Sequence, residues 1–291
     1  MRISDVIRKI HNRYMRLSKR IRDSIIFSVG GVGLISTFAS ILGVSLGDLN
    51  CISIWVRLMI AVAIYVVIGI SFYHVVGKIY ADSVEFTIRG TTVSVCSGDI
   101  FQGEGLRVIG CDTHYDTRID DIVISKKSLH GKLFLEHGDI EEIKKVTNSE
   151  AKRLGLQKNK DDLFDFPLGT IICYDSNVDD RKYLMLSMTK LNDCHEAHTN
   201  MAEFELMLMR MWKEISRVYA GYEVVLPLLG AGITRFDDGP QYKDALLRCM
   251  LCTLNSSGVS LKSKVTILIY GDIKDIPLYE YKEIFHMIPG R

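Results

Sequence analysis

The stretch VVLPLLGAGITRF, from Val224 to Phe236, joins an apolar run to a loop that carries two glycines one residue apart. An apolar run without polar alternation is typical of a strand covered on both faces by helices. The run KVTILIY, residues 264–270, has the same character. Gly230 and Gly232 leave two interpretations open: they end a strand, or they let the backbone come close to a phosphate.

Strand-like and helix-like segments alternate on both sides of this stretch. Apolar residues recur at three- and four-residue steps from Asn200 to Tyr219 and predict a helix there. The charged segment Glu136–Asp165 predicts a short exposed helix and a mobile loop. Further helices are expected over 241–254 and 278–287, and further strands over 84–88, 92–96, 106–111, 169–175 and 182–188. This alternation predicts a three-layer α/β domain with a mixed sheet.

The N-terminal quarter of the chain has a different composition. Ser24–Leu46 contains no charge, and Ile52–Val76 contains one, Arg57. Since about 20 apolar residues cross the hydrocarbon core, we expect two transmembrane helices in a tight hairpin. A signal peptide and a buried core helix are the alternatives, but the first run is longer than the apolar region of a signal peptide. Arg57 is interpreted as an interfacial anchor.

The charges around these helices predict their orientation. The first 22 residues hold eight Lys or Arg and one acid, Asp5, so this end is expected in the cytoplasm. Two crossings return the chain to the same side. We therefore expect a basic cytoplasmic segment (1–22), a membrane hairpin (23–77) and a cytoplasmic ligand-binding domain (78–291).

Composition excludes some functions and leaves others open. The net charge of +1 gives no reason to expect nucleic acid as a partner. Seven cysteines, an odd number with irregular spacing, predict reduced residues rather than a disulfide framework. Cys194, His195 and His198 could bind a metal together, but a surface loop is the favoured interpretation. We predict no metal site and no catalytic residue.

Three segments that follow strands carry polar groups, and ligands of α/β sheets usually lie at the carboxyl ends of strands. The first, VSVCSGDIF, contains Asp99, whose carboxylate could accept a hydrogen bond from an exocyclic amine or could cap the next turn. The second comprises CDTHYDTRIDD and SKKSLHG, between Cys111 and Gly131. The third is the glycine loop, where Arg235 could add charge for an anion and the following helix would favour it.

These three segments, in this order, resemble the macro domain, the α/β fold that binds ADP-ribose, over about residues 84–290. Gly98-Asp99-Ile100 and the stretch from Pro227 to Ile233 carry the resemblance. It implies that Asp99 and Ile100 read adenine. The diphosphate and distal ribose would be held by Leu229, Gly230, Ala231, Gly232, Ile233, Thr234 and Arg235, and the far end of the ligand would face Asp112, Asp116, Thr117, Ser128 and His130.

The sequence departs from the common macro-domain pattern, and these departures indicate which branch of the family it resembles. Many macro domains that hydrolyse ADP-ribose links have Asn-Ala-Ala-Asn after the third strand, where this chain reads VIGCDTHYDT. The asparagine that positions water is therefore absent. HYDT and SLHG, preceded by a basic tail and a helical hairpin, resemble the membrane effectors of type II Thoeris antiphage systems of bacteria.

That family implies a function without catalysis or a cofactor. A partner TIR-domain enzyme would make an ADP-ribose derivative conjugated to histidine, and the macro domain would bind it. The effector would then oligomerise and damage the inner membrane, which leads to cell death. Small residues four apart in the first helix, such as Gly33 and Thr37, would let helices approach closely, either between chains or within the hairpin. A membrane-anchored ADP-ribosyl hydrolase and a passive anchor or sensor are the alternatives.

Overall fold

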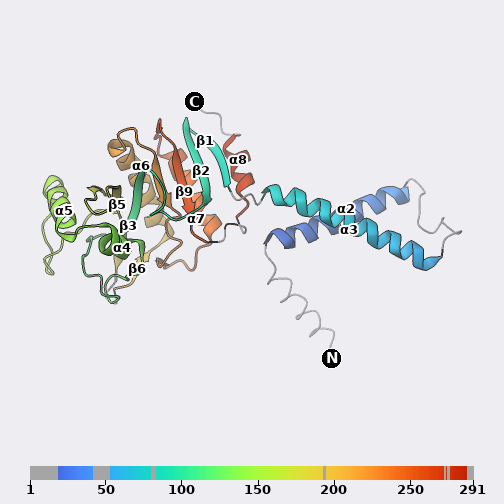
Figure 1. The fold of residues 1–291 in the computed structure, drawn as a ribbon, viewed down its shortest axis with the longest axis horizontal. Helices are drawn as coiled ribbons and strands as arrows, with labels where there is room; N and C mark the ends of the chain where they lie inside the picture. Colours follow the sequence, from blue (N-terminus) through green and yellow to red (C-terminus); the bar gives the residue numbers. More distant parts are fainter. Residues whose placement is uncertain are drawn as a thin grey trace. The chain divides into compact units, whose positions relative to one another are not determined.

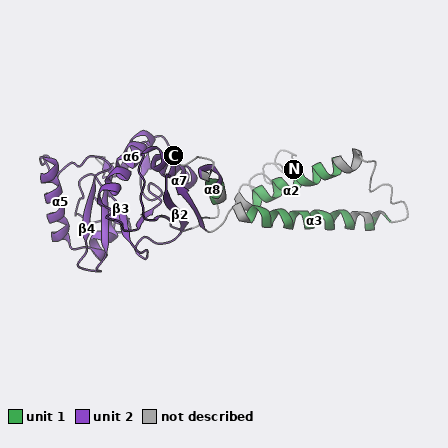
Figure 2. Cartoon of the chain, turned by 90° about the horizontal axis from the view of Figure 1, so that it is seen from above, with its two compact units in different colours: residues 1–82, 273–281 green, residues 83–272, 282–291 purple. Residues whose placement is uncertain are grey.

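A computed structural model describes residues 19–41, 53–79, 83–192, 195–271, 273 and 276–286. The basic segment before Lys19, the linker between the first two helices and Cys194 lie outside the described residues. The chain forms two compact units, Met1–Asp82 with Ile273–Tyr281, and Ser83–Asp272 with Lys282–Arg291 (Figure 2). The three-part division expected from the sequence stays a prediction.

The first unit contains two long helices, α2 (Lys19–Ile41) and α3 (Ile54–Ile79), which pack against each other. A Cβ at Gly31 would lie 2.7 Å from Cε2 of Phe72, so glycine is what permits this close approach. The rings of Phe27 and Phe72 also stack, with centroids 6.3 Å apart. At Gly33, in contrast, a Cβ would meet nothing within 4 Å, so the hairpin does not use this small residue.

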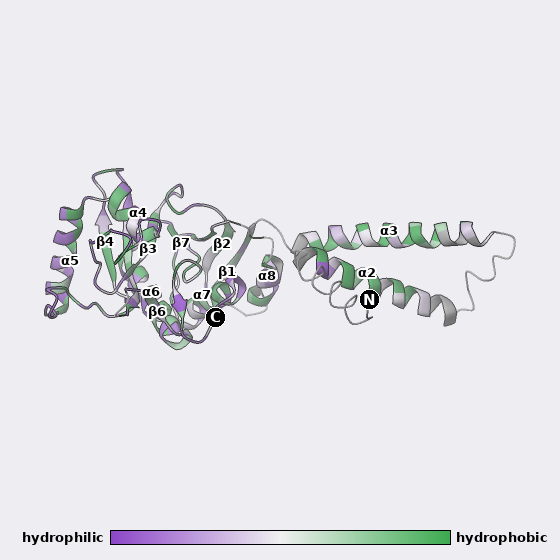
Figure 3. Ribbon diagram, turned by 90° about the horizontal axis from the view of Figure 1, so that it is seen from below, coloured by the Kyte–Doolittle hydropathy of each residue, from purple (hydrophilic) through white to green (hydrophobic). Residues whose placement is uncertain are grey.

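The prediction of two membrane-spanning helices is supported for one of them. Among the described residues, the segment Met59–Gly77 of α3 is long and apolar enough to cross a membrane, by length and composition. Its apolar side chains are exposed, for example Met59 and Val67, at 72% and 63%. Figure 3 shows hydrophobic residues, in green, at several turns of α3. Helix α2 does not qualify, because its first turns are charged and the uncharged stretch of the sequence continues past its described end at Ile41.

The described residues of the second unit form a nine-stranded sheet (Figure 1). Five adjacent strands, in the order β2-β9-β7-β3-β5, run parallel, while β1 pairs antiparallel with β2, and β4 and β6 pair antiparallel with β5. The mixed sheet of an α/β domain is thus confirmed. The strands are β1 (Ser83–Ile88), β2 (Thr91–Ser97), β3 (Leu106–Asp112), β4 (Ile171–Asp175), β5 (Lys182–Leu191), β6 (Ala197–Thr199), β7 (Val224–Pro227), β8 (Arg235–Phe236) and β9 (Val265–Ile269).

The central strands are buried on both faces, as the apolar runs predict. Ile109 of β3 and Met185 of β5 belong to a core that includes Ile143 of a flanking helix. Val108 and Leu184 alternate with them, so they point to the opposite face, and they are also buried. The helices of this unit are α4 (Leu129–Lys132), η2 (Leu133–His137), α5 (Ile140–Leu154), α6 (Met201–Val218), α7 (Lys243–Ser256) and α8 (Leu278–His286).

Two helices show how local sequence sets these boundaries. The side chain of Asn200 caps α6 by accepting a hydrogen bond from the Glu203 N–H, as the predicted start of that helix requires. Helix α5 is longer than expected, with Asp139 as its N-cap and Gly155, at φ 66°, as its C-cap. Because Ile143 of α5 is buried, the expectation of a short exposed helix was wrong.

Candidate functional site

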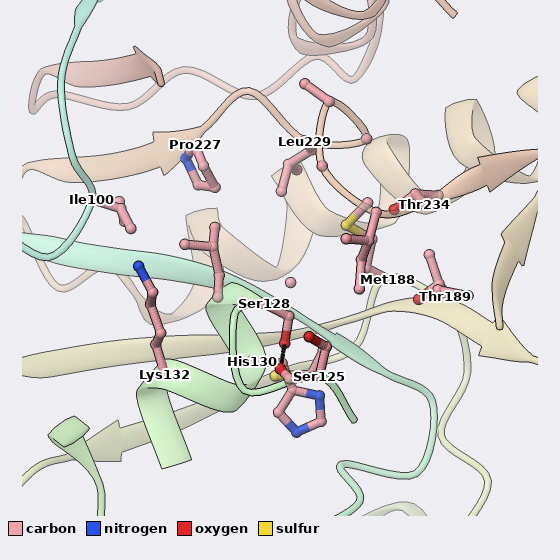
Figure 4. Close-up of a pocket in the computed structure, with 18 of the residues that line it drawn as sticks. Ile100, Ser125, Ser128, His130, Lys132, Met188, Thr189, Pro227, Leu229 and Thr234 are labelled. Atoms are coloured by element: carbon pink, nitrogen blue, oxygen red, sulfur yellow. Dashed lines mark hydrogen bonds between the residues drawn. The ribbon is translucent and has the colours of Figure 1, made fainter. Parts of the chain in front are cut away.

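A cavity of about 630 Å³ lies at the carboxyl ends of β2, β3, β7 and β9 (Figure 4). Parallel strands end at one edge of a sheet, which brings together loops that are far apart in the sequence. The volume lies within the range of cavities that bind small molecules. The predicted residues that line it are Asp99, Ile100, Asp112, Ser128, His130, Leu229, Gly230, Ala231, Gly232, Ile233 and Thr234.

Asp99 is placed by the turn that follows β2. Its Oδ1 accepts a hydrogen bond from the Phe101 N–H at 3.0 Å, so the turn-capping interpretation is correct for this oxygen. The side chain is half-buried and lines the cavity. A carboxylate has two oxygens, each with more than one acceptor position, and capping the turn therefore leaves capacity for a ligand amine.

Asp112, at the end of β3, is the buried charge of the site. Its two oxygens accept backbone N–H groups of His114 and Asp116 at 3.1 and 3.0 Å. Nδ1 of His130 lies 3.6 Å from its Oδ1. Burial by itself raises the pKa of Asp112, but the side-chain hydrogen bond from His114 and the backbone hydrogen bonds help to outweigh this and hold that pKa below its usual value. Asp112 is therefore ionised at neutral pH.

The pKa values of the two histidines beside Asp112 are shifted in opposite directions. A side-chain hydrogen bond to Asp112 raises the pKa of His114, whereas burial lowers the pKa of His130. The Nε2 atom of His130 is buried and has no hydrogen-bond partner among the described residues. In Figure 4 the imidazole points away from Pro227 and Leu229, which stand across the cavity. The ring of His130 thus lies beside Asp112, on the side of the cavity away from Pro227 and Leu229.

The SLHG segment builds a rigid turn beside the cavity. The Ser128 hydroxyl donates to the Ser125 carbonyl at 2.6 Å and accepts from the Gly131 N–H at 2.9 Å (Figure 4). A Cβ at Gly131 would lie 2.2 Å from the Ser125 oxygen, so no other residue fits there without moving the backbone. The role of Ser128 seen in the structure is to cap α4.

The two glycines of the opening stretch have different explanations. Gly230 has φ +80°, a conformation that favours glycine, and a Cβ there would lie 3.1 Å from the Phe236 ring and 3.2 Å from Leu246. Gly232 has neither constraint, since a Cβ would meet nothing within 4 Å. The fold therefore requires glycine at the first position. At the second position it leaves open space beside the cavity.

Three predicted ligand residues do not line the cavity: Asp116, Thr117 and Arg235. Asp116 is buried and accepts hydrogen bonds from the backbone and side chain of Arg118. Arg235 is exposed, and its Nη1 lies 2.5 Å from Oε1 of Glu196. These partners were not foreseen, because each contact depends on how a loop folds back.

One residue of the other candidate centre in the sequence, His198, is engaged by ion pairs. His198 binds Asp237, with 2.7 Å between Nδ1 and Oδ1, and also contacts Glu196. In the described part of the chain, no group of three or more His, Cys, Asp or Glu side chains could hold a metal ion. The position of Cys194, part of the suggested cluster, lies outside that part.

Sequence reasoning missed several residues that line the cavity, chiefly Lys132, Met188 and Tyr270. Figure 4 shows the Lys132 side chain extending from α4 toward Ile100. Its local sequence gave no signal, because the close packing of Gly131 that fixes the neighbouring backbone is seen only in the structure. Met188 lies within β5 and Tyr270 follows β9, and nothing in their local sequence marks them.

Comparison with known proteins identifies the family of the chain. Residues 93–270 match the family model described as Thoeris protein ThsA, Macro domain. The chain is 28% identical over 262 residues to the Thoeris protein ThsA of Bacillus amyloliquefaciens (strain Y2), covering 86% of this chain and 84% of that protein.

Among solved structures, two forms of the Oceanobacillus iheyensis macrodomain are similar to this chain. A mutant with ADPR has a TM-score of 0.48 at 12% identity and covers 71% of this chain and 100% of the other. The macrodomain with MES bound has a TM-score of 0.46 at 14% identity, over 71% and 98%. On the strength of the family model, which spans more than half of its length, the chain belongs to the family of the Thoeris ThsA macro domain.

Proposed function

We propose that this chain is a membrane effector of bacterial antiphage defence whose macro domain binds an ADP-ribose-derived signal, with histidine-conjugated ADP-ribose as the preferred ligand. The observation that carries the proposal is the cavity, which places Asp99 and Ile100 on one loop and the open Gly232 loop on another, around one space of about 630 Å³. The carboxylate of Asp99 suits an adenine amine, and the backbone around Gly232 suits a diphosphate.

The first unit supplies the membrane part of the proposal. Helix α3 exposes apolar side chains along Met59–Gly77, a length that matches the hydrocarbon core. With α2 as the second, less apolar crossing, the basic N-terminus and the macro domain would both lie on the cytoplasmic side of the inner membrane. One hairpin encloses no path for solutes, so damage to the membrane would require several chains to assemble.

Binding would drive assembly through differential affinity. A ligand shifts an equilibrium only as far as it binds one state better than the other. A signal that binds the assembled chains better would therefore raise their population. A partner TIR-domain enzyme would supply that signal, and the chain would need no cofactor and no catalytic residue of its own.

Dye release from liposomes tests the proposal. The full chain is reconstituted with a self-quenched dye and challenged with ADP-ribose, NAD and histidine-conjugated ADP-ribose. We expect release with the conjugate, and no release from Gly232→Glu, in which a charged side chain enters the open space. Measured binding without release would contradict the effector role and favour a passive sensor. Turnover of an ADP-ribosylated protein by the same preparation would favour the hydrolase.

A further inference from the structure

The charged side chains around the cavity are not equally available to a ligand. Both oxygens of Asp112 already accept backbone N–H groups, and Asp99 accepts one at Oδ1. Nζ of Lys243 donates to the Tyr270 carbonyl at 3.1 Å. The ammonium groups of Lys127 and Lys132 have no hydrogen bond or ion pair within the part of the chain that the structure describes. Of these two lysines, Lys127 is exposed and Lys132 is half-buried.

Lys132 is held in place by its neighbours on both sides. Before it, Gly131 is packed against the Ser125 backbone so closely that a Cβ would overlap the carbonyl oxygen. After it, Leu133 and Phe134 are buried in the core. The Lys132 N–H also donates to the Ser128 carbonyl at 3.0 Å. The backbone that carries this lysine therefore loses little freedom when a ligand binds.

Lys132 lines the cavity as a half-buried residue, and its ammonium has no partner among the described residues. A ligand anion that reaches the ammonium would form a charge-assisted hydrogen bond with it, and such bonds are among the stronger ones in proteins. In Figure 4 the Lys132 side chain extends from α4 toward Ile100, so it faces the same cavity as the loop that carries Asp99.

We propose that Lys132 is a ligand-binding residue that pairs with a phosphate of a nucleotide in the cavity and makes the site selective for anionic ligands. This inference rests on the proposed function and assigns the cation of the site. Arg235, which the sequence suggested for that role, is already paired with Glu196 and lies outside the cavity lining. Lys132 thus complements the glycine loop, whose backbone contributes N–H groups and no charge.

Calorimetry of the full chain in detergent, with ADP-ribose as the probe, tests this assignment. Lys132→Gln keeps most of the side chain's length and removes the charge, and we expect it to weaken binding about tenfold. The wild-type affinity should fall with rising salt, and this dependence should be smaller in the variant. Lys132→Arg, which keeps the charge, should retain affinity near that of the wild type.

Lys126→Gln is the matched control. Lys126 lies on the turn just before α4 and carries the same charge, but it pairs with Asp121 at 3.5 Å and does not line the cavity. It should bind ADP-ribose as the wild type does. Equal affinities for wild type and Lys132→Gln would overturn the assignment and leave the proposed function intact, as would an equal loss in Lys132→Arg or in Lys126→Gln. If the wild type itself gives no binding, the proposed function fails first.

Discussion

Nη1 of Arg235 lies 2.5 Å from Oε1 of Glu196, and this ion pair joins the end of the glycine loop to the segment before β6. The pair is exposed, with 61% of the Arg235 side chain accessible. Exposed ion pairs contribute about 1 kcal/mol or less to stability.

Arg235→Gln should therefore change the free energy of unfolding by less than about 1 kcal/mol and the affinity for ADP-ribose by less than about threefold. Chemical denaturation and calorimetry measure the two quantities. A loss of affinity as large as that of Lys132→Gln would show that Arg235 leaves Glu196 to bind the ligand.

The two glycines of the loop should respond differently to substitution. Gly230→Ala places a side chain on a backbone at φ +80° and against Phe236, and should destabilise the fold by about 1 kcal/mol or more. Gly232→Ala should leave the melting temperature nearly unchanged, because its Cβ has open space. The reverse order of melting temperatures would contradict this assignment of the glycines.

A larger side chain at position 232 should affect ligand binding but not membrane insertion. Gly232→Glu should abolish binding of ADP-ribose, since its carboxylate would occupy and charge the space beside the cavity, while membrane insertion stays unchanged. Calorimetry and membrane fractionation of one preparation give both results. Normal binding by this variant would contradict the proposal that the loop binds the diphosphate of the ligand.

The histidines beside Asp112 should titrate on opposite sides of about pH 6.5, the ordinary value for histidine. The Asp112 hydrogen bond raises the pKa of His114, and burial lowers the pKa of His130. NMR titration of the imidazole signals checks both directions. Asp112→Asn should bring the His114 pKa back toward its ordinary value, and an unchanged value would show that another group raises it.

The sign of the effect on stability follows from the raised pKa of His114. Its contribution to folding is fully present below about pH 6.5 and is lost as the pH rises through the folded-state value. The wild type should therefore exceed His114→Gln in unfolding free energy at about pH 5, and the difference should shrink toward alkaline pH. If this difference in unfolding free energy grew with pH, it would contradict a raised pKa of His114 in the folded state.

The features predicted well are those that local chemistry determines. The apolar runs at 224–227 and 265–269 are strands because they must be buried on both faces, and Asn200 caps α6 through a bond to a residue three positions away. Gly98-Asp99-Ile100 and Gly230 to Thr234 lie at strand ends, and parallel strands bring such ends together. These relations can be read from short windows of sequence.

The errors concern contacts between distant segments. Arg235 is paired with Glu196, which lies 39 positions earlier, and a sequence window around the glycine loop cannot show that partner. Asp116 is engaged by Arg118 because the polar loop turns back on itself. Lys132 was overlooked because its position at the cavity depends on the packing of Gly131 against Ser125. The buried face of α5 was not predicted, because its few buried residues lie among many charged residues in the sequence.

The proposed membrane role of α3 predicts a selective effect of charge. Val67→Asp places a carboxylate within the segment Met59–Gly77, at a cost of about 2.5–3.5 kcal/mol for insertion. The variant should be released from membranes by alkaline carbonate. Leu206→Asp, at a half-exposed position of α6, should remain in the membrane fraction with the wild type. Equal extraction of both variants would contradict the assignment of α3.

The central claim is that the cavity at the strand ends binds an ADP-ribose-derived signal. Calorimetric titration of the full chain with ADP-ribose, NAD and histidine-conjugated ADP-ribose tests it most directly. The account predicts saturable binding of one ligand per chain, tightest for the conjugate and absent for Gly232→Glu. No heat with any of the three ligands, from a chain that is folded and membrane-inserted, would contradict it.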